Sequence, residues 1–447
     1  MSLYKRIALL AAPMALQSMI SFSVGLADNL MVGSLGELAL SGVYIANQIQ
    51  NMLHMLVAGL EASMIVLATQ YWGRKDAENT KAIIGISLKF SIVASSLLLL
   101  ATLAYPEQIL RLFSNEEAVI AEGLKYLSII RYTYVFFCVN QVMIAAMRCV
   151  EQVRIGLFLS IFTFVVNVSL NWILIFGKLG APALGIEGAA LATLIARILE
   201  TPVILIYIRF VDKKLQIRLR DLLVSKALLV RDFFKYGFPI ILGDILWGIN
   251  LMIQGAIMGR LGAVALASTS IANAVFSMMA VGVYGTAGAS AIIIGQTVGA
   301  KEYDKLRLYV RQLQIVFLVV GVFSGLLIYF AKDYILMLYN LTDETIVMAK
   351  QFLTILSVTI VGTSYQMSCL TGIVRPGGST RFVLINDSVF VWFVVIPSAL
   401  LAAFVFEAHP AVVFACLKCD QILKCAVAVV TVNRFNWVKN LTHGTDL

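Results

Sequence analysis

The sequence predicts an all-α integral membrane protein whose twelve transmembrane helices form two six-helix bundles related as a parallel repeat. Three observations predict this fold class: the composition, a succession of long apolar runs, and an internal repeat. Of the 447 residues, 60% are hydrophobic and 13% are charged, whereas soluble domains carry about 25% charged residues. A soluble fold of this size cannot cover its surface with so few polar side chains, but a bilayer removes that requirement.

Apolar runs long enough to cross a bilayer, which takes about 20 residues, follow one another along the chain. They are too long for barrel strands and lack two-residue alternation. The first run has no signal-peptide cleavage site, so we expect it to be a retained span. The predicted spans cover residues 7–32, 45–71, 82–104, 119–147, 155–177, 184–208, 232–258, 266–298, 310–330, 345–373, 382–404 and 410–433.

The distribution of cationic residues predicts the orientation. With an even number of spans, both termini lie on one side of the membrane. Most Lys and Arg residues between the spans fall on that side, and the opposite connections contain only Arg111, Lys178, Arg260 and Lys332. The positive-inside rule therefore predicts cytoplasmic termini in a multi-pass protein of the inner cell membrane.

The formal net charge of +9 is explained by the Lys and Arg residues gathered in the cytoplasmic connections. We therefore expect no nucleic-acid partner. The six cysteines lie in or beside apolar segments. The Cys416-x-x-Cys419 pair has no second pair or histidine cluster with it, so we interpret these cysteines as small apolar residues.

An internal repeat appears when the sequence is shifted by 226 residues. Pro13 then falls on Pro239, and Gln70-x-x-Gly73 falls on Gln296-x-x-Gly299. With one more residue of offset, Arg148 falls on Arg375. Because each half has an even number of spans, both halves insert with the same orientation. Such parallel repeats are found in transporters that bind substrate between their halves and rock between two open states.

The repeat also predicts the domain boundaries. We expect an N-lobe over residues 1–210, a cytoplasmic amphipathic linker over residues 211–230 and a C-lobe over residues 231–447. In the linker, leucines and isoleucines alternate with cations, which is typical of a helix or strap on the membrane surface. We therefore expect membrane lipids among the partners of the chain.

Several segments, in their order and spacing, resemble the multidrug and toxic compound extrusion (MATE) family over nearly the whole chain. Segments 28–36 (Asp-Asn-Leu-Met-Val-Gly-Ser-Leu-Gly) and 70–76 resemble its spans 1 and 2. Segments 167–177 and 188–193 resemble spans 5 and 6, and segments 372–381 and 434–442 resemble the second half and the tail. The resemblance implies a monomeric secondary antiporter that exports amphiphilic organic cations in exchange for H⁺ or Na⁺, with no cofactor.

Asp28, late in the first span, matches the acidic residue of the family's N-lobe. Asn167, Asn171 and Thr193 match the positions around it, so the resemblance implies a proton or Na⁺ site made by these four residues. Asn167 and Asn171 are four residues apart and share one helix face. Some family members have a second Asp where this chain has Asn171, which weakens the expectation of tight Na⁺ binding.

Carboxylates in the second half form a further group of candidates, because an ionised side chain inside a span costs roughly 2.5–3.5 kcal/mol and therefore suggests a function. Asp244 resembles a carboxylate of one bacterial branch of the family, and Asp387 lies in the eleventh span. Asp420 and Lys424, four residues apart in the twelfth span, are either functional or a pair that neutralises itself.

Glu61, in the middle of the second span, has two interpretations. It is either a cavity-facing acid that attracts cationic substrate or the partner of His54 or of a basic residue. A loose cavity with aromatic and methionine walls selects for size and amphiphilicity. The candidates for this lining are Trp247, Met252, Met278, Tyr284 and Tyr365.

Two other functions, those of a flippase and of an enzyme, fit the sequence less well. A flippase for a lipid-linked precursor is the alternative within the same superfamily, but it usually has a cationic cavity, whereas the charge within these spans is mainly acidic. An enzyme is disfavoured, since the chain has no HExxH motif, nucleophile elbow or phosphate-binding Gly-Lys loop. Without an ATP-binding motif, we expect an ion gradient to supply the energy.

Overall fold

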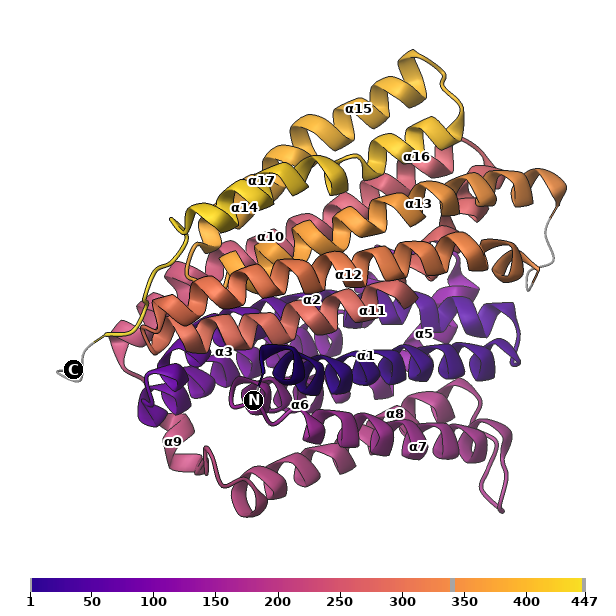
Figure 1. Cartoon of the computed structure of the whole chain (residues 1–447). Coiled ribbons are helices and arrows are strands. Elements are labelled where there is room, and N and C mark those ends of the chain that lie inside the picture. The colour runs from indigo at the N-terminus through magenta and orange to yellow at the C-terminus, as the bar shows by residue number, and fades with distance from the viewer. Residues whose placement is uncertain (1, 338–341, 444–447) are drawn as a thin grey trace. The chain divides into compact units, whose positions relative to one another are not determined.

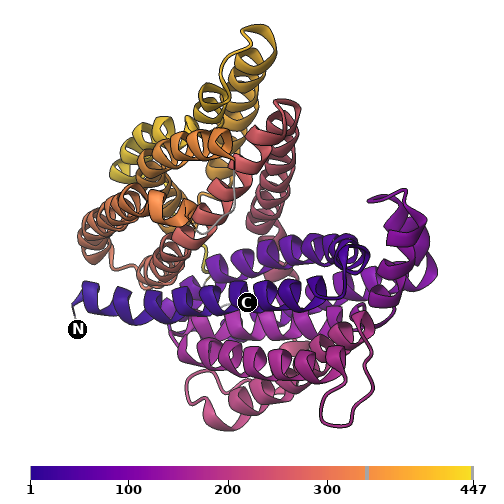
Figure 2. The same cartoon turned by 90° about the vertical axis from the view of Figure 1, so that its right-hand side faces the viewer.

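The computed structural model describes residues 2–337 and 342–443, and the description below is confined to them. Figures 1 and 2 show helices throughout these residues, as the sequence predicts. Large apolar side chains are exposed along many of the helices, among them Leu97, Phe158, Phe323 and Phe393. Such exposure suits a bilayer, where lipid tails replace a protein core as the apolar environment.

The first half of the chain forms nine α-helices and one π-helical turn. They are α1 (Leu3–Gly33), α2 (Glu37–Gly73), α3 (Ala77–Ala104), α4 (Pro106–Arg111), α5 (Glu117–Ile130), α6 (Thr133–Cys149), α7 (Arg154–Phe176), α8 (Ile186–Ile206), η1 (Tyr207–Val211) and α9 (Leu219–Leu223).

The second half adds α10 (Ala227–Arg260), α11 (Ala263–Gly299), α12 (Tyr303–Leu336), α13 (Asp343–Cys369), η2 (Leu370–Val374), α14 (Thr380–Val389), η3 (Phe390–Val395), α15 (Ile396–Leu400), η4 (Leu401–Val405), α16 (Pro410–Lys418) and α17 (Asp420–Arg434). Within each half, sequence neighbours pack side by side, as α7 and α8 do and as α12 and α13 do (Figure 1).

Ten of the predicted spans are single runs long and apolar enough to cross a membrane. The predicted span 119–147 is instead the pair α5 and α6, which bend by 55° at a short break. The predicted span 410–433 consists of α16 and α17, broken at Cys419. This last span contains Lys418, Asp420 and Lys424, so it has more charge than an ordinary apolar span.

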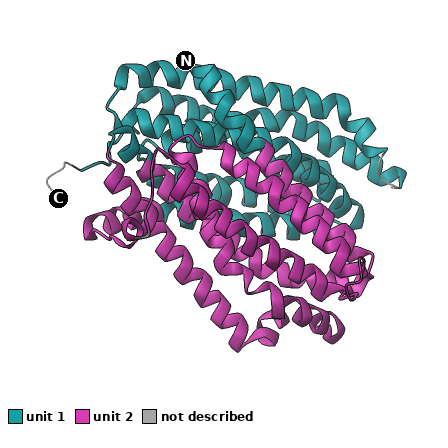
Figure 3. Ribbon diagram, turned by 90° about the horizontal axis from the view of Figure 1, so that it is seen from below, with its two compact units in different colours: residues 1–15, 69–75, 238–447 teal, residues 16–68, 76–237 magenta. Residues whose placement is uncertain are grey.

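The described residues fall into two compact units, coloured separately in Figure 3. Unit 1 contains residues 1–15, 69–75 and 238–447, and unit 2 contains residues 16–68 and 76–237. The beginning of α1 and the end of α2 are therefore grouped with the second half of the chain. The lobe boundaries at residues 210 and 231 remain a prediction from the sequence.

The end of α2 joins unit 1 through the repeated Gln-x-x-Gly motifs. A Cβ atom on Gly73 would lie 2.0 Å from the backbone oxygen of Gln296, and one on Gly299 would lie 1.9 Å from that of Gln70. No larger residue fits at either position, because the two backbones meet there directly. Each glycine thus contacts the backbone of the glutamine in the other copy of the motif, which explains why the sequence repeats the two glycines.

The C-terminal tail packs over the same crossing within unit 1. Gln70 Nε2 donates hydrogen bonds to the backbone oxygens of Pro376 (2.8 Å) and Lys439 (3.3 Å). Its Oε1 accepts one from the backbone nitrogen of Leu441 at 2.8 Å. Trp437 is 2% exposed, so the tail is anchored by an aromatic side chain as well as by backbone bonds.

The linker of unit 2 is a strap with one short helix, α9. Its backbone lies against α3, where a Cβ atom on Gly85 would be 2.5 Å from the oxygen of Leu222. Lys81 Nζ contacts Asp221 Oδ2 at 3.2 Å, and Lys89 Nζ donates to the oxygen of Leu223 at 2.7 Å. These bonds fix the strap to one end of α3.

Candidate functional site

Asp28 and the three residues predicted around it form a continuous chain of hydrogen bonds in unit 2. Asn171 Nδ2, on α7, donates to Asp28 Oδ1 on α1 at 2.5 Å and also to Asn167 Oδ1 at 3.1 Å. Asn167 Nδ2 then donates to Thr193 Oγ1 on α8 at 3.1 Å. Three helices therefore bring these side chains together, as the sequence predicts.

One polar atom of this chain has no partner. Asn171 Oδ1 is buried and accepts no hydrogen bond within the described residues. The amide cannot turn to relieve this, because its nitrogen donates to both Asp28 and Asn167. Leaving a buried acceptor unsatisfied costs about 1–3 kcal/mol. A proton donor or a small cation beside the Asp28 carboxylate would satisfy this oxygen.

Asp28 itself has no ion pair among the described residues, and the Asn171 amide is its one hydrogen-bond donor. Arg197, which lies one turn beyond Thr193 on α8, pairs instead with Glu200, with 2.8 Å between Nη1 and Oε2. The carboxylate of Asp28 is therefore partly buried without a neutralising side chain. The oxygens of Asp28, Asn171 and Thr193 are of the kind that bind hard cations such as Na⁺.

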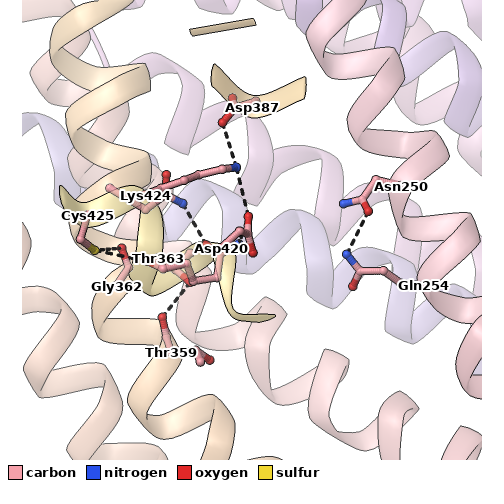
Figure 4. A network of polar contacts seen from close by, with 11 residues as sticks. Asn250, Gln254, Thr359, Gly362, Thr363, Asp387, Asp420, Lys424 and Cys425 are labelled. Carbon is pink, nitrogen blue, oxygen red and sulfur yellow. Dashed lines mark hydrogen bonds and ion pairs between the residues drawn. The ribbon is translucent and has the colours of Figure 1, made fainter. Parts of the chain in front are cut away.

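The second predicted group is an ionic network in unit 1. Lys424 Nζ lies 2.9 Å from Asp387 Oδ1 on α14 and 3.0 Å from Asp420 Oδ2 on α17 (Figure 4). Lys424 and Asp420 are each 3% exposed. Gln421 Nε2 also donates to both carboxylate oxygens of Asp420, at 2.9 and 3.0 Å. The Lys424 ammonium thus contacts two carboxylates, and both oxygens of Asp420 have partners.

Asp244, the fourth candidate of the C-lobe, contacts a different cation. Its Oδ1 lies 3.7 Å from Arg375 Nη2. The repeat-related Arg148 behaves similarly, because its Nη2 donates to Gln17 Oε1 on α1 at 2.8 Å. Each of the two repeated arginines therefore contacts the first helix of its own half of the chain.

Glu61 forms no hydrogen bond or ion pair with any described residue. His54, one of its suggested partners, lies against the ring of Phe137 with 5.5 Å between ring centroids. The structure therefore gives no support to a Glu61–His54 pair. Arg148 is a basic residue that attracts Glu61 electrostatically, so the basic-partner and cavity-facing interpretations both stay predictions.

The lining candidates Trp247, Met252, Met278 and Tyr284 are exposed by 39%, 75%, 57% and 44%. Tyr365 is less exposed and donates its hydroxyl to Gln314 Oε1 at 2.7 Å. Among the described residues, no hydrogen bond or ring contact joins any two of these five, so the lining remains a prediction.

Sequence reasoning did not single out three polar residues of unit 1, Lys418, Gln254 and Asn250. Lys418 Nζ donates to Gln254 Oε1 at 3.3 Å, and Gln254 Nε2 donates to Asn250 Oδ1 at 3.2 Å. The internal repeat could have indicated this group, because Gln254 is the position equivalent to Asp28 when the sequence is shifted by 226 residues.

Comparison with known proteins is consistent with these features. The family model described as MatE matches the chain twice, over residues 13–173 and 239–401. The two matches begin at Pro13 and Pro239, the first pair of repeated residues. Both halves of the chain therefore carry the same family pattern.

Two relatives have names that describe drug resistance. "Probable multidrug resistance protein YoeA" of Bacillus subtilis is 26% identical over 405 residues, which are 89% of this chain and 86% of the relative. "Probable multidrug resistance protein NorM" of Thermotoga maritima is 24% identical over 411 residues, covering 90% and 86%.

Solved structures share the fold. The Vibrio cholerae MATE transporter VcmN in its bent form matches with a TM-score of 0.87 and 19% identity, over 96% of each chain. The eukaryotic MATE transporter AtDTX14 matches with a TM-score of 0.84 and 19% identity, over 98% of this chain and 97% of the other. The twelve-helix architecture predicted from the sequence is therefore confirmed.

Proposed function

The chain belongs to the MatE family of membrane transporters, and from that premise we propose that it exports amphiphilic, cationic drugs or metabolites by antiport against H⁺ or Na⁺. The relatives named for multidrug resistance support the efflux direction. The parallel repeat supports alternating access between two lobes. The positive-inside distribution of Lys and Arg supports an inner-membrane location with both termini in the cytoplasm.

The observation that carries the coupling proposal is the arrangement at Asn171, whose Nδ2 donates to the Asp28 carboxylate while its buried Oδ1 has no partner among the described residues. A carboxylate without a neutralising side chain in an apolar span is costly unless something positive joins it. A proton or Na⁺ ion removes that cost, and it also gives Asn171 Oδ1 a partner. Rehydration of the site from the other side of the membrane would then release the ion.

The flippase alternative requires several cations able to bind a pyrophosphate. In the described part of the spans, Lys424, Arg375 and Arg197 each pair with a carboxylate. The positive charge of these three residues is thereby compensated, whereas Arg148 and Lys418 donate to amide oxygens. The three compensated cations favour the antiporter over the flippase.

The test is transport by the purified full chain in phospholipid vesicles, with either a pH gradient or a Na⁺ gradient imposed and a fluorescent cationic dye as substrate. We expect one of the two gradients to drive dye movement against its concentration. If neither gradient drives movement in sealed vesicles that contain folded protein, the antiport proposal is wrong.

A further inference from the structure

Glu61 is a carboxylate inside a span to which the coupling mechanism at Asp28 assigns no role. It lies on α2 in unit 2, and it is half-buried. No described residue forms a hydrogen bond or an ion pair with it. Because an ionised carboxylate within a span is costly unless a positive charge compensates it, Glu61 requires either a fixed cation or a proton.

The fixed cation that attracts Glu61 is Arg148, in the last turn of α6. Arg148 Nη2 donates to Gln17 Oε1 on α1 at 2.8 Å, but its Nε atom is buried and has no acceptor among the described residues. A guanidinium only donates hydrogen bonds, and a buried donor without an acceptor is destabilising. Unit 2 therefore contains a carboxylate without a donor and, attracting it, a guanidinium nitrogen without an acceptor.

The internal repeat gives a reference for this couple. Arg375, the equivalent of Arg148, lies with Nη2 3.7 Å from Asp244 Oδ1, and its Nε atom is likewise buried without an acceptor. At the shift of 226 residues, Asp244 falls on Ser18, which cannot serve as an acid. The first half of the chain thus supplies from α2 the carboxylate that the second half supplies from α10. The couple is in contact in the second half, whereas Glu61 and Arg148 are not paired.

The other ionisable groups around Glu61 do not neutralise it. Lys89 on α3 donates to the strap, at Leu223 O and Ser225 Oγ. His54 on α2 lies against an aromatic ring, as does Lys235 at the start of α10. The groups that interact electrostatically with Glu61 come from α6, and they are Arg148 and the thiols of Cys138 and Cys149.

A proton suits Glu61 better than a metal ion does. Hard cations take several oxygen ligands, and the hydroxyls of Ser63 and Ser87 beside this turn of α2 each donate to a backbone oxygen of α2. No group of three His, Cys, Asp or Glu residues suited to a metal ion forms within the described residues. A proton, in contrast, needs only one oxygen of the carboxylate.

We propose that Glu61 is a proton site in addition to Asp28, which carries a proton while it is unpaired and releases it when its carboxylate pairs with Arg148 Nε. The O–H bond of the carboxyl group breaks, the proton passes to water, and Arg148 stays charged throughout. This proposal rests on the proposed antiport function and deepens it, because each turnover then exchanges one proton more than the Asp28 site accounts for.

The bond between Arg148 and Gln17 connects this site to the helix that carries Asp28. Gln17 and Asp28 lie three turns apart on the part of α1 that belongs to unit 2. When Arg148 moves toward an ionised Glu61, its bond to Gln17 Oε1 is strained or lost. Arg148 is therefore a positioning residue that makes the protonation of Glu61 felt by α1.

The test counts exchanged protons. Purified full chain is placed in phospholipid vesicles with a difference of one pH unit, equal Na⁺ and K⁺ on both sides, and valinomycin to hold the membrane potential at zero. The measured quantity is the concentration ratio of a permanently cationic dye at which its net flux reverses. Each proton exchanged multiplies this ratio by about ten. We therefore expect Glu61→Gln to lower the ratio about tenfold, whether Asp28 exchanges H⁺ or Na⁺.

Three further variants separate this role from an effect on folding. Glu61→Asp keeps a carboxylate and should retain the wild-type ratio. Arg148→Gln removes the charge that favours proton release, so it should lower the ratio as Glu61→Gln does. Glu302→Gln removes an exposed carboxylate paired with Lys305 and should leave the ratio unchanged. In weakly buffered detergent solution, saturation with dye should release about one proton fewer from Glu61→Gln than from the wild type.

The outcomes distinguish this inference from the function on which it rests. If Glu61→Gln reverses at the wild-type ratio, or if it does not transport but releases as many protons as the wild type on binding dye, the Glu61 site is wrong and the antiporter stands. If the wild-type protein moves the dye under neither a pH gradient nor a Na⁺ gradient, the antiport function itself is wrong.

Discussion

Asp28 and Asp420 are both carboxylates inside apolar spans, but they differ in what surrounds them. Asp420 is 3% exposed, contacts Lys424, and accepts hydrogen bonds from Gln421 Nε2 at both carboxylate oxygens. Asp28 is partly buried, and the described structure gives it a single amide donor and no ion pair. One carboxylate is thus neutralised by the protein, whereas the other is not.

This difference suggests which site exchanges ions. A carboxylate held by a lysine gains little from a proton or Na⁺, because the ion would have to displace the ammonium. A proton or Na⁺ that binds at Asp28 instead provides a partner for the carboxylate and for Asn171 Oδ1 at the same time. We therefore expect the Asp387–Lys424–Asp420 network to stabilise unit 1 and the Asp28 site to couple transport, and four predictions test this distinction.

The largest expected effect is on stability. Lys424→Met leaves the carboxylates of Asp387 and Asp420 without their cation, and breaking a buried pair in this way costs about 3–5 kcal/mol. We expect a clear fall in the thermal melting temperature of the purified protein. Adding Asp420→Asn to the same chain should recover part of the loss. An unchanged melting temperature would contradict a stabilising role for the network.

The second prediction concerns transport. Asp28→Asn keeps the size of the side chain but cannot bind a proton or a cation, so gradient-driven export should fall about 100-fold, which corresponds to roughly 2.7 kcal/mol. Its melting temperature should stay close to that of the wild type, in contrast to Lys424→Met. The measurement is dye transport in vesicles with equal amounts of folded protein. Wild-type transport by this variant would contradict the assignment.

The third prediction tests the orphaned oxygen. Asn171→Asp replaces it with a second carboxylate beside Asp28, and two neighbouring carboxylates favour a bound cation. We expect the variant to bind Na⁺ about tenfold more tightly than the wild type, a change of about 1.4 kcal/mol. Thermal stabilisation as Na⁺ is titrated measures this affinity. Asn171→Ser serves as the control, and equal Na⁺ responses of all three proteins would count against an ion site here.

The smallest effect is expected on the linker, where Asp221 is a carboxylate near solvent. Burial opposes its ionisation, but the backbone N–H of Arg218 and the ammonium of Lys81 outweigh this and hold the pKa of Asp221 below its usual value. A lowered pKa stabilises the fold above the unfolded pKa of about 3.9, and the contribution disappears as pH falls through the folded pKa.

Because the Lys81 and Asp221 side chains are 21% and 29% exposed, Asp221→Asn should cost at most about 1 kcal/mol at pH 7. The difference in melting temperature between wild type and variant should shrink near pH 3. A loss as large as that of Lys424→Met would mean that burial does not distinguish these carboxylates.

The sequence located the acidic candidates but not their partners. The four-residue spacing of Asp420 and Lys424 left open whether they pair, and the structure adds Asp387 from a helix about 33 residues earlier in the chain. Asn167, Asn171 and Thr193 were matched to Asp28 by family resemblance. The orphaned Asn171 Oδ1 could not be predicted, because it depends on the orientation of one amide within a network of three helices.

Lys418 was missed for a related reason. In the sequence it is one more charge in an already charged twelfth span, with Asp420 two residues away and Lys424 beyond. Only the structure shows that Asp420 bonds to Lys424 and Gln421, whereas Lys418 donates to Gln254.

The sequence by itself determined the class, the number of spans and the repeat of this protein, because apolar length and the recurrence of residues are properties of the chain order. The tertiary structure alone decided which interior charges are neutralised. Coulomb and hydrogen-bond energies depend on distances of a few ångströms between different helices, and residues as far apart in the sequence as Asp28 and Asn171 acquire such distances only when the helices pack.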